Sequence, residues 1–146
     1  MTDKEKAADK YYQKNFGITL AEYNELLARQ GGVCKGCARP PGKTRLSLDH
    51  DHRFDRIQIK SRKLGNIWNI IVVKLSGEKE TFNVHNKKVF IEESKRMFRR
   101  QSIRGILCLR CNKALALLED SKAPLKPAVR LRNLANYLDE FEESGK

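Results

Sequence analysis

The first part of the chain carries apolar residues at the three- and four-residue spacing of a helix. Over residues 5–30 this pattern is interrupted at Gly17, so we predict two helical segments. The second begins at Thr19, an N-cap whose partner Glu22 lies three positions later and completes a capping box. Gly31, which is followed by a second glycine, ends this helix. The chain is therefore expected to open with a pair of helices.

Strand patterns follow in the middle of the chain. Residues 45–50 (RLSLDH) alternate between apolar and polar side chains, as a half-buried strand does. The run 66–75 (NIWNIIVVKL) is rich in β-branched residues and predicts a buried strand, and after a turn the segment 81–84 predicts a returning one. Residues 104–108 (RGILC) predict one more short apolar strand. Two separated strands thus enclose a β-rich insert.

Helical spacing returns in three places. Asn86 is placed to cap a helix over residues 87–101, and residues 112–120 predict a second helix. Residues 124–141, which begin with prolines, predict an amphipathic C-terminal helix. We expect this helix to cover the core, with the pairing of two subunits as the alternative. The fold class is therefore α+β, and 146 residues suit a single domain, 1–146.

The charge balance is strongly basic. Thirty lysines and arginines face eighteen acidic residues, which gives a net charge of +12 and a pI near 9.7. Residues 53–107 hold fourteen of the basic and five of the acidic residues, a net of +9. Such a balance favours a polyanionic partner, nucleic acid first, over a merely solvated basic surface.

No targeting or membrane segment is evident. The start of the chain is charged, and the longest apolar run, residues 70–73, is far too short to span a membrane. We therefore expect a cytosolic protein with no membrane partner, in which thiols stay reduced.

The four cysteines form two CxxC pairs, and none is left over. Each pair presents two thiolates from one tight turn, and four thiolates make a closed tetrahedral zinc site without an open position for catalysis. Disulfides fit poorly with a cytosolic chain, and a thioredoxin-like motif would need a βαβ setting that is absent. We predict structural Zn²⁺ bound by Cys34, Cys37, Cys108 and Cys111.

The stretch LDHDHR lies between the two CxxC pairs, and Asn112 follows the second pair directly. Asp49 and the amide oxygen of Asn112 offer the oxygen ligands that Mg²⁺ or Mn²⁺ prefers, and a neutral imidazole can take a proton from water. Because neighbouring side chains of a strand face opposite ways, we expect the strand to end or bend near His50. An exposed polar turn, or a metal site made of His50, His52 and aspartates, are the alternatives.

The motifs GGVCKGC, LDHDHR and RGILCLRCNKALALLED together resemble the recombination endonuclease VII family of phage-type HNH nucleases, over residues 10–53 and 104–139. The resemblance implies a ββα-metal (HNH) core, stapled by the four-cysteine zinc site, around one divalent ion. By position, Asp49 and Asn112 match the metal ligands and His50 matches the general base. His52 matches a histidine near the scissile phosphate, and Asp51 has no assigned role.

The chain departs from the family pattern by the length of its insert, residues 54–103. We expect this insert to form a basic β-rich lobe plus a helix that widens the DNA-binding surface. The predicted DNA contacts are Arg53, Lys88, Lys95, Arg96, Arg99, Arg100 and Arg104.

The leading hypothesis is a metal-dependent DNA endonuclease that nicks DNA or cleaves branched DNA such as junctions. The alternatives are a zinc-stapled DNA-binding module without catalysis, and an HNH nuclease that serves DNA packaging or intron homing. A homodimer remains open. If the protein is phage-encoded, it is expected in the cytoplasm of the bacterial host.

Overall fold

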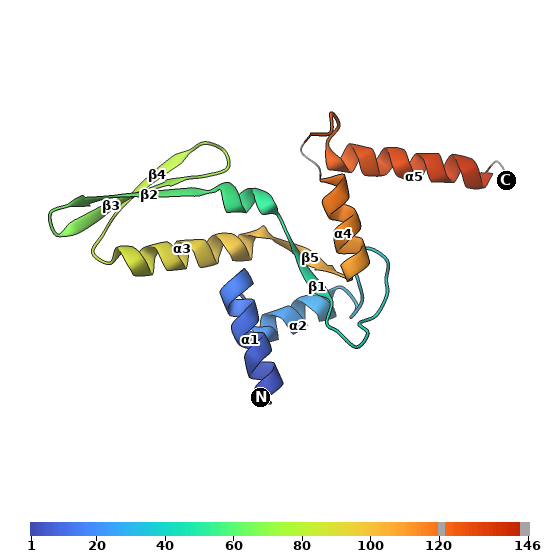
Figure 1. Cartoon of the computed structure of the whole chain (residues 1–146), viewed down its shortest axis with the longest axis horizontal. Helices are drawn as coiled ribbons and strands as arrows, with labels where there is room; N and C mark the ends of the chain where they lie inside the picture. Colours follow the sequence, from blue (N-terminus) through green and yellow to red (C-terminus); the bar gives the residue numbers. More distant parts are fainter. Residues whose placement is uncertain (120–121, 144–146) are drawn as a thin grey trace.

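The computed structural model describes residues 1–119 and 122–143, and it confirms a mixed α+β fold. Two small antiparallel sheets lie on different parts of the molecule, with helices between and beside them (Figure 1). The elements in chain order are α1 (Asp3–Phe16), α2 (Leu20–Arg29), β1 (Ser47–His50), the 3₁₀ helix η1 (His52–Arg56), β2 (Gln58–Leu64), β3 (Ile67–Val73), β4 (Lys79–Val84), α3 (Lys87–Ser102), β5 (Ile103–Leu107), α4 (Leu109–Leu118) and α5 (Pro127–Glu143).

The helical pair α1 and α2 forms as the sequence predicts. The capping box of Thr19 and Glu22 is present, and Thr2 forms a second capping box at the start of α1. Gly17 ends α1 with a φ of 72°, which favours glycine. A Cβ atom there would also lie 2.5 Å from the carbonyl oxygen of Arg96 in α3. The turn between α1 and α2 is therefore shaped by both its conformation and its neighbour.

The main core lies between the helical pair and the sheet of β1 and β5. The rings of Tyr12 and Tyr23 stack with centroids 4.6 Å apart, and the Tyr23 hydroxyl donates a 2.8 Å hydrogen bond to the carbonyl of Leu46. Satisfying this buried hydroxyl lets a large aromatic residue fill the centre of the core without an unpaired polar group. The buried members are Tyr12, Ile18, Leu20, Tyr23, Cys34, Leu46, Leu48, Ile106 and Leu107.

Strands β1 and β5 pair antiparallel although about fifty residues separate them in the chain. Leu48 lies opposite Ile106 and Asp49 opposite Gly105, but the register shifts between Asp49 and His50. Strand β1 also ends at His50, so the expected end or bend is confirmed. The irregularity allows consecutive residues to depart from strict alternation.

The insert between β1 and β5 contains a three-stranded sheet in the order β2-β3-β4. The sequence analysis assigned no strand to β2, which is rich in exposed basic residues. A Gly65-Asn66 turn, with Gly65 at a φ of 59°, joins β2 to β3 and is a known hairpin pattern. The sheet contacts α3 through the rings of Phe82 and Phe90, whose centroids lie 5.0 Å apart.

Two helix boundaries differ from those predicted. Helix α4 begins at Leu109 and not at residue 112, because Cys108 acts as its N-cap and accepts a hydrogen bond from the N–H of Cys111. Helix α5 begins at Pro127 rather than residue 124, since proline suits the first helical turn. The predicted end of α4, Asp120, lies outside the described residues.

Helix α5 does not cover the core, contrary to our expectation. Figure 1 shows it extending from the end of α4, away from the sheet of β1 and β5. Helices α1 and α2 already close that core. Four of the apolar residues of α5 remain between 41% and 65% exposed: Leu131, Leu134, Tyr137 and Leu138.

Within the described ranges, no helix has the length and apolar content needed to cross a membrane.

Candidate metal-binding and catalytic site

The four cysteines meet at one point, as their pairing predicts. Every sulfur lies within 4.8 Å of the others, and the Cys37 and Cys108 sulfurs are 3.8 Å apart. A tetrahedral ion with bonds of about 2.3 Å to sulfur would separate its ligands by about 3.8 Å. The donor set and the spacing therefore suit zinc. The first CxxC lies in the loop after α2, and the second forms the start of α4.

Backbone N–H groups favour the thiolate form of Cys34 in this cluster. Cys34 is buried, which raises its pKa, but the N–H groups of Cys108 (3.1 Å) and Gly36 (3.4 Å) donate to its sulfur. These hydrogen bonds prevail and lower the pKa of Cys34 to about 6. The thiolate is the form that binds metal, so the backbone favours the ligating state.

The first CxxC loop is also tied to β5 directly. The N–H of Lys35 donates to the carbonyl of Ile106 at 3.1 Å. The amide side chain of Gln30 accepts from the Ile106 N–H and donates to its carbonyl, at 3.1 and 2.8 Å. Sequence reasoning missed Gln30, because a polar residue at a helix end carries no pattern of its own. Its hydrogen bonds satisfy an edge of β5 that no strand covers.

His50 lies at the end of β1, half-buried between two rings. Its ring centroid is 5.6 Å from that of Phe16 in α1 and 4.4 Å from that of His52. Burial, and then the neighbouring His52, lowers the pKa of His50 below its usual value. A lowered pKa keeps the imidazole neutral near pH 7, which is the state that can accept a proton.

His52 begins η1 and lies beside an acidic residue that sequence reasoning missed. Its Nδ1 atom is 3.4 Å from a carboxylate oxygen of Asp55. His50, His52 and Asp55 place their ligand atoms within 4.8 Å of one another. These three residues are close enough to bind one metal ion, so the alternative metal site is compatible with the structure, with Asp55 as its carboxylate.

Asp49 is buried, and its carboxylate is held by an arginine. Arg104 in β5 donates from Nε and Nη2 to the two oxygens at 2.8 and 2.9 Å. The same guanidinium pairs with Glu119 after α4. Asp49 retains 7% exposure, so this bidentate pair supplies the counter-charge that a buried carboxylate needs.

Asn112 is half-buried in the first turn of α4, which contacts both β1 and β5. Its backbone N–H donates to the carbonyl of Cys108 at 2.9 Å. Within the described part of the chain, no hydrogen bond joins its side chain to Asp49 or to the two histidines. Asn112 therefore lies on the helix that packs beside β1, the strand of Asp49, but no hydrogen bond joins the side chains of these two described residues.

Asp51, which had no assigned role, organises the turn after β1. It caps η1 by accepting from the N–H of Arg53 at 2.9 Å, and it binds the Arg53 guanidinium with its two oxygens. Hydrogen bonds from Arg53 lower the pKa of Asp51 to about 2. Asp51 thus stays ionised and fixes an exposed arginine next to the histidines.

Three arginines of α3 contact the N-terminal helices. Arg99 donates to the carbonyl of Lys14 at 2.7 Å, and Arg96 reaches the carbonyl of Gly17 at 3.4 Å. Arg100 forms an ion pair with Glu22. These residues brace α3 against α1 and α2, and their role as DNA contacts stays a prediction. Lys88 and Lys95 are exposed on the same helix.

Comparison with known proteins places the chain in a family. The family model for recombination endonuclease VII matches residues 9–140, so the chain belongs to that family. Proteins called "Gene 59 protein" from Mycobacterium phages D29 and L5 are each 51% identical to it over 39 residues. That stretch covers 26% of this chain and about a quarter (24%) of each relative. No solved structure matches.

The cysteine cluster generates the first prediction. Cys37→Ser removes one of four ligands, so we expect the protein to lose its stoichiometric zinc, measured by elemental analysis. Because structural zinc contributes several kcal/mol, the melting temperature should fall by about 10 °C or more. Lys35→Ser, in the same loop, is the control and should change neither quantity. Equal zinc in both variants would show that the cluster does not bind it.

Proposed function

We propose that the protein is a metal-dependent DNA endonuclease that hydrolyses phosphodiester bonds. The observation that carries the proposal is His50, whose ring is held at the end of β1 next to the buried carboxylate of Asp49. Membership of the recombination endonuclease VII family and the net charge of +12 support a DNA substrate. Nicking and the cleavage of branched DNA are both compatible with this chemistry.

In this proposal β1, β5 and α4 act as a ββα-metal (HNH) core. Asp49 and Asn112 would hold the divalent ion, because carboxylate and amide oxygens are ligands that Mg²⁺ and Mn²⁺ accept. When bound, such an ion neutralises charge on the phosphate and on the leaving oxygen. The four-cysteine cluster, with zinc, would keep α4 beside β1, so that Asn112 and Asp49 belong to one site.

His50 would act as the general base. Its neutral ring accepts a proton from a water molecule while the water oxygen bonds to phosphorus. The bond from phosphorus to the 3′ oxygen then breaks, and that oxygen takes a proton, which leaves 5′-phosphate and 3′-hydroxyl ends. His52, whose ring lies beside that of His50, would contact the phosphate, and Arg53 would add a positive charge there.

Arg104 affects how the site receives a cation. Its guanidinium holds both oxygens of Asp49. A divalent ion at Asp49 must therefore share or replace this partner. Glu119 offers Arg104 a second carboxylate, so the arginine keeps a counter-charge when Asp49 is engaged elsewhere.

The insert of residues 54–103 would extend the DNA-binding surface. Lys88 and Lys95 have exposed side chains that would meet phosphates, and Arg53, which is exposed but paired with Asp51, would add to the positive field together with Arg96, Arg99, Arg100 and Arg104. We further infer a homodimer formed through α5, because four of its large apolar side chains, Leu131, Leu134, Tyr137 and Leu138, stay exposed.

The proposed function predicts the loss of cleavage on removal of the base. With supercoiled plasmid and a four-way junction as substrates, His50→Ala should lower the cleavage rate by about 10²–10⁴-fold, the usual contribution of a general base. His85→Ala is the matched control, since His85 is exposed in the insert, and should cleave normally.

Two results would contradict the proposal. Cleavage unaffected by His50→Ala would exclude His50 as the base. Tight DNA binding with no cleavage of either substrate, at any concentration of Mg²⁺ or Mn²⁺, would favour a non-catalytic DNA-binding module. Omission of the divalent ion is a better control than a chelator, which would also remove zinc.

The lowered pKa of His50 predicts the pH dependence of cleavage. The base works only when neutral, so kcat/KM should be level above neutral pH and fall as the pH drops through the pKa of His50. Its midpoint should lie below the ordinary histidine value of 6.5. Phe16→Ala opens one wall around the ring and should move the midpoint upward. A midpoint above 7 in the unaltered protein would be inconsistent with this assignment.

The homodimer predicts a mass of two chains in solution. Leu134→Lys combined with Leu138→Lys places two charges on the exposed face of α5 and should give monomers by sedimentation equilibrium. Leu75→Lys, at a similarly exposed leucine in the insert, should remain dimeric. A monomeric unaltered protein would refute the dimer without affecting the proposed chemistry.

A further inference from the structure

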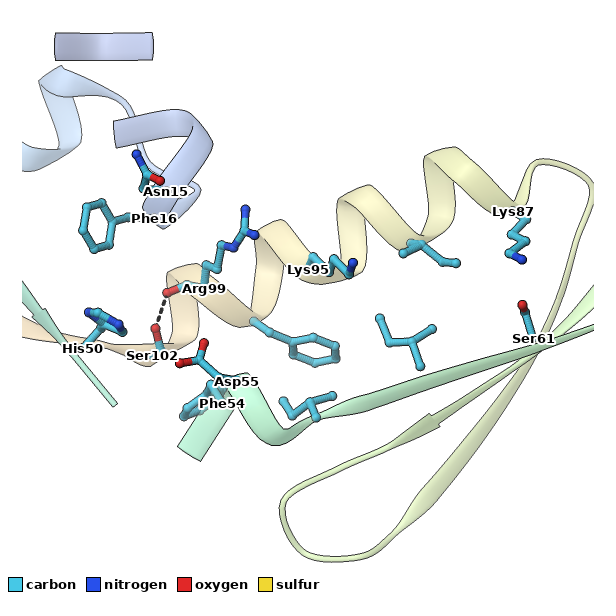
Figure 2. A pocket seen from close by; sticks show the side chains of 14 residues that line it. Asn15, Phe16, His50, Phe54, Asp55, Ser61, Lys87, Lys95, Arg99 and Ser102 are labelled. Atoms are coloured by element: carbon cyan, nitrogen blue, oxygen red, sulfur yellow. Dashed lines mark hydrogen bonds between the residues drawn. The ribbon is translucent and has the colours of Figure 1, made fainter. Parts of the chain in front are cut away.

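A groove of about 550 Å³ runs from His50 along the space between β2 and α3. Figure 2 shows His50, Phe16 and Asp55 at one end, and Lys87 facing Ser61 at the other. The end of α1 and the 3₁₀ helix η1 complete the end near His50. The proposed catalytic base therefore stands at the mouth of a groove whose two long walls belong to the insert.

The α3 wall of the groove is built by one face of the helix. Lys87, Ile91, Lys95 and Arg99 all line it and follow one another at intervals of four residues, which places them on the same side. With a rise of about 1.5 Å per residue, these side chains span about 18 Å from Lys87 to Arg99. Lys95 is exposed, the Lys87 ammonium lies 4.5 Å from the centre of the Trp68 ring, and Arg99 is bound to the carbonyl of Lys14. A single DNA strand carries one phosphate per about 3.4 Å in a duplex, so Lys95 can meet a phosphate directly while Lys87 and Arg99 add positive charge along the strand.

The opposite wall is apolar and comes from the strand. Ile59 and Ser61 line the groove from one side of β2, and Ile57, the residue directly before β2, joins them. Phe98 of α3 and Phe54 of η1 add aromatic rings. A row of cations opposite apolar and aromatic side chains is the composition of sites that bind the backbone and the bases of single strands together.

The size of the groove selects against a duplex. A volume of about 550 Å³ lies in the range of sites for small ligands. This is far less than the volume of a stretch of duplex, whose major groove alone is about 12 Å wide. A duplex can contact the exposed lysines outside but cannot enter between β2 and α3. An unpaired strand can.

We propose that this groove binds an unpaired stretch of DNA that continues from the scissile phosphate at His50. The unpaired strand would then be held by the insert of residues 54–103, by which this chain departs from the family pattern. This inference rests on the proposed nuclease function for its position at His50. The binding itself depends on the groove alone.

The test measures binding without cleavage. The full-length, zinc-loaded protein, with no Mg²⁺ or Mn²⁺ added, is titrated into a fluorescent blunt duplex and into the same duplex with an unpaired thymidine tail, and anisotropy gives both dissociation constants. The unaltered protein should prefer the tailed duplex by about tenfold, as expected for a stacked base with added phosphate contacts. Lys87→Gln combined with Lys95→Gln should abolish that preference.

The control is a matched loss of charge on the other face of the same strand. Lys60 and Arg62 alternate with Ile59 and Ser61, so they point away from the groove. Lys60→Gln combined with Arg62→Gln should weaken both probes alike and keep the preference. Arg99 is left intact because it also braces α1.

The proposal fails if the unaltered protein binds both probes equally, or if the control pair abolishes the preference as fully as the groove pair. Either result would leave nuclease activity on plasmid DNA unaffected. Conversely, if the protein prefers the tailed duplex but never cleaves DNA, the groove would still be the binding site for an unpaired strand and the proposed nuclease function would be wrong.

Discussion

The meeting of four cysteines is the constraint on which the rest of the site depends. Cys34 and Cys37 follow α2, whereas Cys108 and Cys111 begin α4 more than seventy residues later. Closing that distance costs chain entropy, which a metal ion bound by the four sulfurs would offset. Once closed, the cluster sets β5 against β1 and directs α4 across both strands.

The insert of residues 54–103 contributes no cysteine to the cluster that joins β5 to β1. Its small sheet buries Ile70 and Val72, which lie outside the main core cluster, and it meets α3 through few contacts such as Phe82 on Phe90. Two cavities remain between the strands of the insert and α3. A loosely covered sheet held at both ends by β1 and β5 is thus suited to carrying a groove without disturbing the core.

Periodicity and pairing made most of the architecture predictable. The capping box at Thr19, the cap at Asn86 and the two CxxC pairs each depend on short-range rules, and all appear where they were expected. Strand β2 was not predicted, because its basic, exposed residues show no alternation of apolar and polar side chains beyond its first positions. The start of α4 was misplaced because a cysteine is an unusual N-cap.

The interactions that could not be predicted are those between residues distant in the chain. The residues around Arg99 in the sequence do not indicate that it will donate to the carbonyl of Lys14. Those around Gln30 do not indicate that it will hydrogen-bond the backbone of Ile106. Both side chains have the composition of ordinary surface residues. Charge alone suggested DNA for Arg99, and only the packing of α3 on α1 reveals that the same guanidinium also holds two helices together.

Asp49 illustrates how the fold stabilises a buried carboxylate. A buried carboxylate without a counter-charge would destabilise the fold by several kcal/mol, roughly the cost of an unpaired buried ion. Arg104 removes that cost, and Glu119 keeps Arg104 itself from losing its partner. An incoming cation at Asp49 would therefore exchange one positive charge for another, and the released guanidinium would lie beside the site where a phosphate is expected. If the proposed function holds, a single arginine would link the stability of the fold to the binding of both metal and DNA.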